Sequence, residues 1–152
     1  MQKLNLPDYD FRIVTEGERT MIFDIFRKKF VALTPEEHVR QHFARFLVEE
    51  RNYPVSLMMT EYSLMLNNMS RRCDIIMFER SGAARALVEC KAPTVKINQA
   101  VFDQVARYNL VFRVEYLFVT NGLQHYCCKI NFETGEIIFL PDVPTYDSLL
   151  TS

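Results

Sequence analysis

The sequence predicts an α/β fold in which helices flank a central mixed β-sheet and a β-hairpin lies near the N-terminus. Two segments carry apolar residues at helical spacing, and short apolar runs bounded by turn residues fill much of the remaining chain. Of the 152 residues, 49% are hydrophobic, which suits one well-packed core better than two. We therefore predict a single domain over residues 1–152, with N-terminal strands in 1–33, a core in 34–122, and a hairpin and tail in 123–152.

The N-terminal strands are indicated by two apolar runs with a turn between them. The runs are residues 11–14 and 21–24, and the turn over residues 15–19 contains Gly17. Residues 29–33 continue the apolar character. This pattern predicts a hairpin followed by a third segment that is either strand or loop.

The first helix has clear start signals. Thr34 suits the N-cap, Pro35 suits the first helical position, and Glu37 lies three residues after the cap, as in a capping box. The helix is expected to run to about Arg51, with its core-facing stripe formed by Val39, Phe43, Phe46 and Leu47.

Extended segments alternate with turns after this helix. The runs 73–79 and 85–91 flank a turn at 80–84, which predicts a hairpin. Residues 98–110 show helical periodicity and form the second predicted helix. The other expected elements are extended segments at 55–59, 61–66, 116–120, 125–130 and 136–140, with turns at 67–70 and 134–135.

Two carboxylates stand in apolar runs, where an unpaired charge is costly to bury. Asp74 and Glu89 lie on the two strands of the predicted hairpin, and Lys91 shares a strand face with Glu89. A divalent metal bridging both acids would compensate their charge, and oxygen ligands favour Mg²⁺, with Mn²⁺ as a substitute. The alternative is a pair of structural ion pairs, Asp74 with Arg71 or Arg72 and Glu89 with Lys91.

Composition and charge narrow the classes of partner. The formal net charge is -1, so any surface that binds nucleic acid must be local. The run Arg27-Lys28-Lys29 is more simply interpreted as solvated charge. No apolar stretch is long enough to span a membrane and the start is not a signal peptide, so a soluble cytoplasmic protein is expected. The basic residues nearest the acids in sequence are Arg71, Arg72, Lys91, Lys96 and Arg107.

Cysteine and histidine give no sign of a zinc site. The cysteines lack the spaced pairs of such a site, and we expect reduced thiols. Strand alternation places Cys90 on the face opposite Glu89 and Lys91, and Cys127 and Cys128 on opposite faces of one strand. The three histidines are expected to be structural or surface residues, namely His38, His42 and His125.

A series of motifs runs through most of the chain: Thr34-Pro35-Glu36-Glu37-His38-Val39-Arg40-Gln41, Tyr53-Pro54, Glu61, Arg71-Arg72-Cys73-Asp74-Ile75, Val88-Glu89-Cys90-Lys91-Ala92-Pro93, Gln104-Val105-Ala106-Arg107-Tyr108-Asn109 and Val119-Thr120-Asn121-Gly122. This series resembles the PD-(D/E)xK nuclease superfamily and, within it, the N-terminal nuclease domain of type I restriction enzyme R subunits. An Asp followed by Glu-x-Lys is a weak pattern alone, but the full series in this order is specific. Cys73 stands where the superfamily name has proline, at a position that varies.

The resemblance implies a restriction-endonuclease-like core and a metal-dependent DNA endonuclease. Asp74 and Glu89 would bind the metal, and Lys91 would stabilise charge on the phosphate or orient the attacking water. Gln104 and Tyr108 lie four residues apart on one helix face and, by the resemblance, line the active site.

An acid from the first helix often completes the metal site in this superfamily. By helical angle, Glu36 lies over the apolar stripe, whereas Glu37 lies off it and is already engaged in the capping box. We therefore expect Glu36, rather than Glu37, as the third metal ligand.

Other functions remain open on the sequence alone. The chain has no Gly-x-x-x-x-Gly-Lys-[Ser/Thr] loop for ATP-driven translocation. It is therefore either a free-standing relative of the nuclease domain or a fragment of a longer polypeptide, and we expect the first, with other restriction-modification subunits or a second copy as partners. The main alternative is a catalytically silent module of the same fold that binds nucleic acid or protein. In a purely structural protein, Asp74→Ala would destabilise the fold, whereas acids that repel one another predict unchanged or higher stability.

Overall fold

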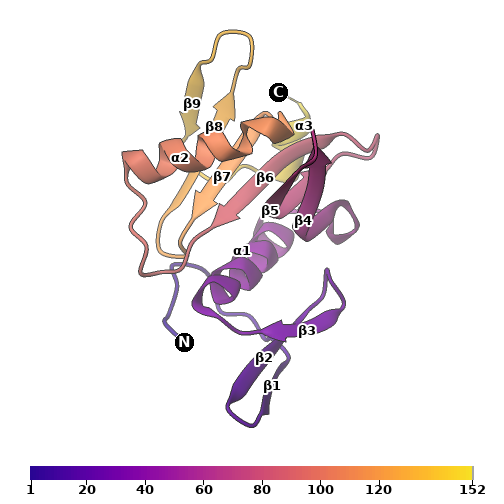
Figure 1. Ribbon diagram of the computed structural model, residues 1–152, viewed down its shortest axis with the longest axis vertical. Coiled ribbons are helices and arrows are strands. Elements are labelled where there is room, and N and C mark those ends of the chain that lie inside the picture. The colour runs from indigo at the N-terminus through magenta and orange to yellow at the C-terminus, as the bar shows by residue number, and fades with distance from the viewer. Residues whose placement is uncertain (152) are drawn as a thin grey trace.

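The computed structural model describes residues 1–151. At its centre lies a six-stranded mixed sheet in the order β4-β5-β6-β7-β8-β9, with helices on both faces (Figure 1). Only β6 and β7 are parallel among these neighbours, and the other pairs in this sheet are antiparallel. This arrangement confirms the predicted fold class. The strands are β4 (Met58–Leu66), β5 (Met69–Phe78), β6 (Ala84–Cys90), β7 (Tyr116–Thr120), β8 (His125–Ile130) and β9 (Ile137–Leu140).

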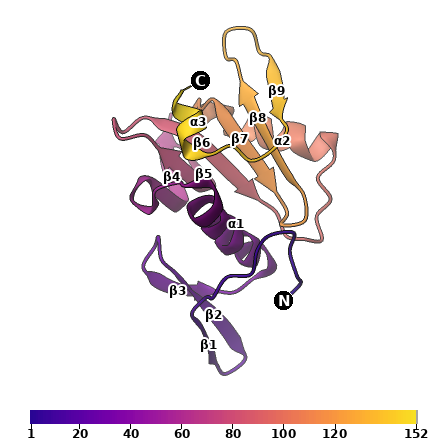
Figure 2. The ribbon, with the colours of Figure 1, turned by 180° about the vertical axis from the view of Figure 1, so that it is seen from behind.

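Helices cover the two faces of the sheet with separate cores (Figures 1 and 2). On one face, α1 (Pro35–Arg51) and α3 (Tyr146–Leu150) pack on side chains such as Val88. On the other face, α2 (Gln99–Asn109) packs on side chains such as Leu87. Since neighbouring residues of a strand point to opposite faces, the continuous apolar run of β6 supplies both cores at once.

A second, three-stranded antiparallel sheet lies beside the N-terminal end of α1 (Figures 1 and 2). It consists of β1 (Ile13–Glu16), β2 (Arg19–Asp24) and β3 (Lys29–Ala32). The predicted hairpin is confirmed, although its first strand begins two residues later than expected. The segment over 29–33, which the sequence left open between strand and loop, is a strand.

Side-chain caps fix the N-terminal ends of both long helices. The Glu37 amide donates to Thr34 Oγ1 over 3.1 Å, which confirms the predicted N-cap of α1. Asn98 caps α2 by accepting from the Val101 amide over 2.9 Å, so α2 begins one residue later than predicted. Three expectations were wrong in detail. Val55–Leu57 is a 3-10 helix rather than extended chain, β5 begins at Met69 inside the turn predicted at 67–70, and the C-terminal tail contains the unpredicted helix α3.

The thiols are placed as strand alternation requires. All four cysteines are free and buried. Cys90 and Cys127 belong to the core beneath α1, whereas Cys128 belongs to the core beneath α2. Burial raises the pKa of the Cys73 thiol to about 12, so it stays protonated at neutral pH. None of the helices in residues 1–151 is long and apolar enough to span a bilayer.

Candidate active site

A cavity of about 320 Å³ opens between α2, the first turn of α1 and strands β4 to β6. All six residues that the sequence singles out for the site line this cavity: Glu36, Asp74, Glu89, Lys91, Gln104 and Tyr108. Four further residues complete its wall, namely Glu61, Arg72, Val105 and Asn109. The fold therefore collects in one place side chains that are spread over 73 positions of the sequence, from 36 to 108.

The antiparallel pairing of β5 and β6 brings the two central acids together. Ile75 pairs with Val88, so one step along this register sets Asp74 across from Glu89. Asp74 is buried, and its Oδ2 accepts a hydrogen bond from the Cys90 amide over 2.6 Å. The hairpin thus holds both carboxylates at one end of a rigid strand pair, as the sequence predicts.

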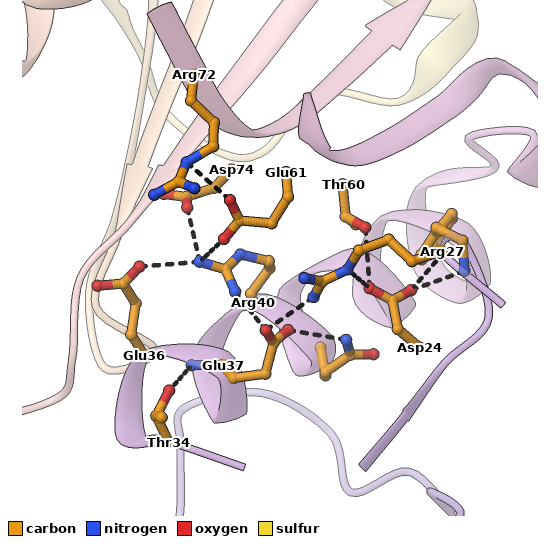
Figure 3. Close-up of polar contacts among 12 residues, drawn as sticks. Asp24, Arg27, Thr34, Glu36, Glu37, Arg40, Thr60, Glu61, Arg72 and Asp74 are labelled. Carbon is orange, nitrogen blue, oxygen red and sulfur yellow. Dashed lines mark hydrogen bonds and ion pairs between the residues drawn. The ribbon is translucent and has the colours of Figure 1, made fainter. Parts of the chain in front are cut away.

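Asp74 does form an ion pair, but with a residue for which the sequence predicts no role. Arg40 Nη2 lies 2.8 Å from Asp74 Oδ1, and the Arg40 side chain is only 5% exposed (Figure 3). The proposed partners Arg71 and Arg72 were wrong. Arg72 binds Glu61 over 3.0 Å, and the Arg71 guanidinium lies 5.2 Å from the ring centre of Tyr108.

Glu61 is a further acid of the site to which the sequence analysis assigned no role. The register of β4 and β5, with Thr60 paired to Ile75 and Tyr62 to Cys73, places Glu61 across from Asp74. Its φ of 50° lies in the left-handed region, which is unusual for a non-glycine residue within a strand. Glu61 Oε1 binds Arg40 Nη2 over 2.8 Å. Strand periodicity does not reveal this acid because its backbone departs from the regular strand conformation.

The two acids of the first helical turn take different positions, and only one of them lines the cavity. Glu36 does so, with a side chain 48% exposed, whereas the Glu37 side chain is 6% exposed and binds Arg27, Arg40 and Gln41. The expected capping-box role of Glu37 and its position off the buried face were therefore wrong. Arg27, from the turn between β2 and β3, covers the side of α1 that carries Glu37. Helical periodicity alone does not indicate this second buried side.

Glu89 is held in an environment that opposes its negative charge. Burial, followed by the negative charge of Asp74, raises the pKa of Glu89 from 4.5 to about 8. The positive charge of Lys91 acts in the opposite direction. Among the described residues, no ion pair within 4.0 Å joins Glu89 to Lys91, so the alternative of a structural Glu89–Lys91 pair is not observed. Lys91 instead lines the cavity.

This raised pKa gives a prediction for the stability of the metal-free protein. Because the folded protein holds the Glu89 proton more tightly than the unfolded chain, this group stabilises the fold fully below pH 4.5, and the contribution is lost as pH rises to about 8. We expect the free energy of unfolding in EDTA, measured by urea denaturation, to fall across this window. Glu89→Gln should flatten that fall, and an equally steep fall in the variant would contradict the assignment.

The oxygen donors of the cavity fit a hard divalent cation. Asp74, Glu89 and Glu36 offer carboxylates, which are the ligands that Mg²⁺ and Mn²⁺ prefer, with no thiolate or imidazole among the lining residues. Within residues 1–151, no three side chains of His, Cys, Asp or Glu form a ready-made metal cluster. Glu36 and Asp74 each direct one oxygen to Arg40 instead.

Helix α2 closes the other side of the cavity. Gln104 and Tyr108 face it, while Phe102 and Ala106 belong to the buried core beneath the helix. The Tyr108 hydroxyl accepts from the Arg72 amide over 3.5 Å, which links α2 to β5 at the rim. The predicted placement of these two polar residues on one helix face is confirmed, and their catalytic roles stay a prediction.

The remaining candidates lie outside the cavity. His38 and His42 bond to the backbone oxygens of Gln2 and His38, respectively, and His125 contacts Thr120 Oγ1 and the backbone oxygen of Asn5. These contacts support structural roles. The interpretation of Arg27 as solvated charge was wrong, because its guanidinium binds Asp24 and Glu37.

Comparison with known proteins identifies a family that matches this sequence. The family described as the type I restriction enzyme R protein N terminus (HSDR_N) matches residues 35–144. A search of curated proteins gives no match.

A solved structure shares the fold. It is a fragment of a protein assigned as an HsdR subunit of a type I restriction enzyme from Vibrio vulnificus YJ016, with a TM-score of 0.55 and 21% sequence identity. The similarity covers 78% of this chain and 25% of that one, so this chain spans about a quarter of the length of the structure it matches.

The family match covers well over half of the sequence and includes every residue of the cavity wall. The structural match supports the same fold over most of the chain. The protein described by these 152 residues therefore belongs to the family of type I restriction enzyme R protein N termini.

Proposed function

We propose that this protein is a metal-dependent DNA endonuclease domain of the PD-(D/E)xK type. The observation that carries the proposal is the meeting of Asp74, Glu89 and Lys91 in one cavity, with Gln104 and Tyr108 on its opposite wall. Two acids with an adjacent ammonium are what phosphodiester hydrolysis requires, since the reaction needs both cation binding and stabilisation of phosphate charge. Membership of the R protein family supports the same class of substrate.

Each residue has a distinct role in this proposal. Asp74, Glu89 and Glu36 would hold Mg²⁺ or Mn²⁺, which supplies Lewis-acid polarisation of the phosphate and activation of a water nucleophile. Lys91 places a positive charge at the same wall, where it stabilises the charge that develops on the phosphate. Gln104 and Tyr108 orient the phosphate through an amide and a hydroxyl.

DNA reaches the cavity past a basic rim. The Arg72 side chain is 67% exposed and lines the cavity, and Arg71 lies beside it on β5. These two residues supply local positive charge that the overall net charge of -1 does not. Because the chain spans only a quarter of the HsdR structure it matches, we propose that other restriction-modification subunits or further domains contribute the rest of the DNA contact.

The test is cleavage of supercoiled and linear DNA by the purified protein. We expect cleavage with Mg²⁺ or Mn²⁺ and complete loss of cleavage when EDTA removes the metal, because the acids alone do not supply a Lewis acid. Addition of excess metal should restore it. Cleavage that persists in EDTA would contradict the metal-dependent mechanism.

One observation favours a second candidate, a binding module of the same fold without catalysis. Arg40 already neutralises the oxygens of Glu36, Glu61 and Asp74, so these acids have a structural role without any metal. In that case, well-folded protein would bind DNA equally in EDTA and in Mg²⁺, measured by fluorescence anisotropy, and would cut none of it.

A further inference from the structure

We propose that Arg40 is a resident cation of the site, which competes with a divalent metal for Glu36 and Asp74 and must release both carboxylates before the metal binds. The inference rests on the proposed function, because it takes these two acids as metal ligands. Arg40 itself would neither bind the metal nor contact the DNA. Its role is to position the acids and to set the affinity of the site for metal.

The first support is the number of carboxylates at one nitrogen. Arg40 Nη2 lies 2.9 Å from Glu36 Oε1, 2.8 Å from Glu61 Oε1 and 2.8 Å from Asp74 Oδ1 (Figure 3). The acids come from α1, β4 and β5. A guanidinium Nη carries only two N–H donors, so it cannot satisfy three acceptors with one hydrogen each. The contact is therefore dominated by charge, as in the oxygen shell of a metal ion.

The second support is spatial exclusion. Since each of these oxygens lies within 2.9 Å of the same nitrogen, no two of them are further apart than twice that distance. Mg²⁺ and Ca²⁺ bind oxygens at roughly 2.0–2.6 Å, so a divalent ion bound to these same two oxygens of Glu36 and Asp74 would require the space next to Arg40 Nη2. Two cations in contact with the same oxygens also repel each other strongly in a partly buried site.

The third support is a place for the guanidinium to remain when it releases these oxygens. Arg40 Nη1 lies 2.6 Å from Glu37 Oε1, and Glu37 does not line the cavity. Glu37 is fixed in turn by Arg27 over 2.8 Å and by Gln41 over 2.9 Å. Figure 3 shows Arg40 between the two groups of acids, with Glu37 on the side of Arg27 and Asp74 on the side of Arg72. Arg40 therefore keeps a carboxylate partner behind the cavity.

The consequence is a site whose acids are neutralised in the absence of metal. Without Arg40, Glu36 and Asp74 would lose their ion-pair partner and Glu61 would keep only Arg72. A divalent cation would then bind Glu36 and Asp74 more tightly. With Arg40 in place, metal binding must break ion pairs that already exist. Arg40 thus lowers the affinity of the site for metal and raises the stability of the metal-free protein.

The test measures Mn²⁺ binding by isothermal titration calorimetry in the absence of DNA. Arg40→Gln is expected to bind Mn²⁺ about tenfold more tightly than the wild type, or better, because it removes a competing positive charge. Arg27→Gln is the matched control, since Arg27 belongs to the same ion-pair network but does not line the cavity. Its Mn²⁺ affinity should equal that of the wild type. Unchanged or weaker binding by folded Arg40→Gln would overturn the proposal.

A second measurement on the wild type keeps the test decisive if Arg40→Gln does not fold. The Nε–H of Arg40 is buried, and its proton signal can be followed by ¹⁵N-edited NMR during a Mg²⁺ titration. We expect the Arg40 signal to shift on metal binding while the Arg27 signal stays fixed. Mg²⁺ binding that leaves the Arg40 signal unchanged would overturn the proposal.

These outcomes are separate from the test of nuclease activity. If the wild type cuts no DNA but Arg40→Gln binds Mn²⁺ more tightly than the wild type, the nuclease proposal is refuted and the competition between Arg40 and metal stands. Conversely, if the wild type cuts DNA and Arg40→Gln binds Mn²⁺ with unchanged affinity, only the proposed competition is refuted.

Discussion

Replacing Asp74 by alanine is expected to destabilise the metal-free protein by roughly 1–3 kcal/mol, because it leaves the buried Cys90 amide without its acceptor and removes one of the carboxylates around Arg40. Asp74 Oδ1 binds Arg40, and Asp74 Oδ2 accepts from the Cys90 amide. Arg40 and Cys90 are both buried, so water cannot fully replace the contacts that they lose. Urea denaturation in EDTA measures the change.

Glu89→Gln is the matched control for this prediction and should act in the opposite direction. Burial and the charge of Asp74 raise the pKa of Glu89 to about 8, so its charged form is unfavourable in the fold. A neutral isostere is therefore expected to raise the free energy of unfolding near pH 8, by roughly 1–3 kcal/mol. Equal destabilisation by the two variants would show that Glu89 has a stabilising partner in the folded protein that its surroundings do not indicate.

The contrast between the two acids changes what stability experiments can decide. From the sequence, loss of stability in Asp74→Ala points to a structural protein, whereas unchanged stability points to repelling acids in a catalytic site. Arg40 makes the stability of Asp74→Ala unable to distinguish these two cases, since Asp74 has a buried counter-ion whether or not the protein is an enzyme. Repulsion between the acids is instead expected to appear as a gain in the free energy of unfolding when Glu89 is replaced by Gln.

Much of the fold follows from local sequence signals. Strands β7 and β8 have the predicted bounds, because each is a short run with clear turn residues at its ends. Thr34 and Asn98 act as helix caps through contacts three residues away, which is within the range of a sequence pattern. Helix α3 was missed, since five residues are too few to show a helical period.

The site was predictable only where its chemistry lies in motifs. Asp74, Glu89, Lys91, Gln104 and Tyr108 reach one cavity because the predicted hairpin and second helix form as expected.

The ion-pair network around Arg40 was not predictable in the same way. Its contact with Asp74 joins residues 34 positions apart, which no periodicity reports. The burial of Glu37 likewise depends on Arg27, which reaches α1 from the separate N-terminal sheet.

Replacing Lys91 by alanine is expected to reduce DNA cleavage by roughly 100-fold or more, because one preorganised positive charge is lost from the phosphate-binding wall. The loss should appear in kcat rather than in the affinity for Mn²⁺, since Lys91 is not among the proposed ligands. Stability should change little, because the Lys91 backbone amide, which the substitution retains, donates to the Thr120 oxygen over 2.8 Å.

The control for Lys91→Ala is Lys96→Ala, a nearby exposed lysine outside the cavity. Both variants lose one positive charge, so a general weakening of DNA attraction would affect them alike. Single-turnover cleavage at saturating DNA, measured at several salt concentrations, separates the two effects: the Lys91 defect should persist at low salt, whereas a purely electrostatic defect should disappear there. If both variants cut DNA at the wild-type rate, Lys91 has no catalytic role and the motif serves only to fold the hairpin.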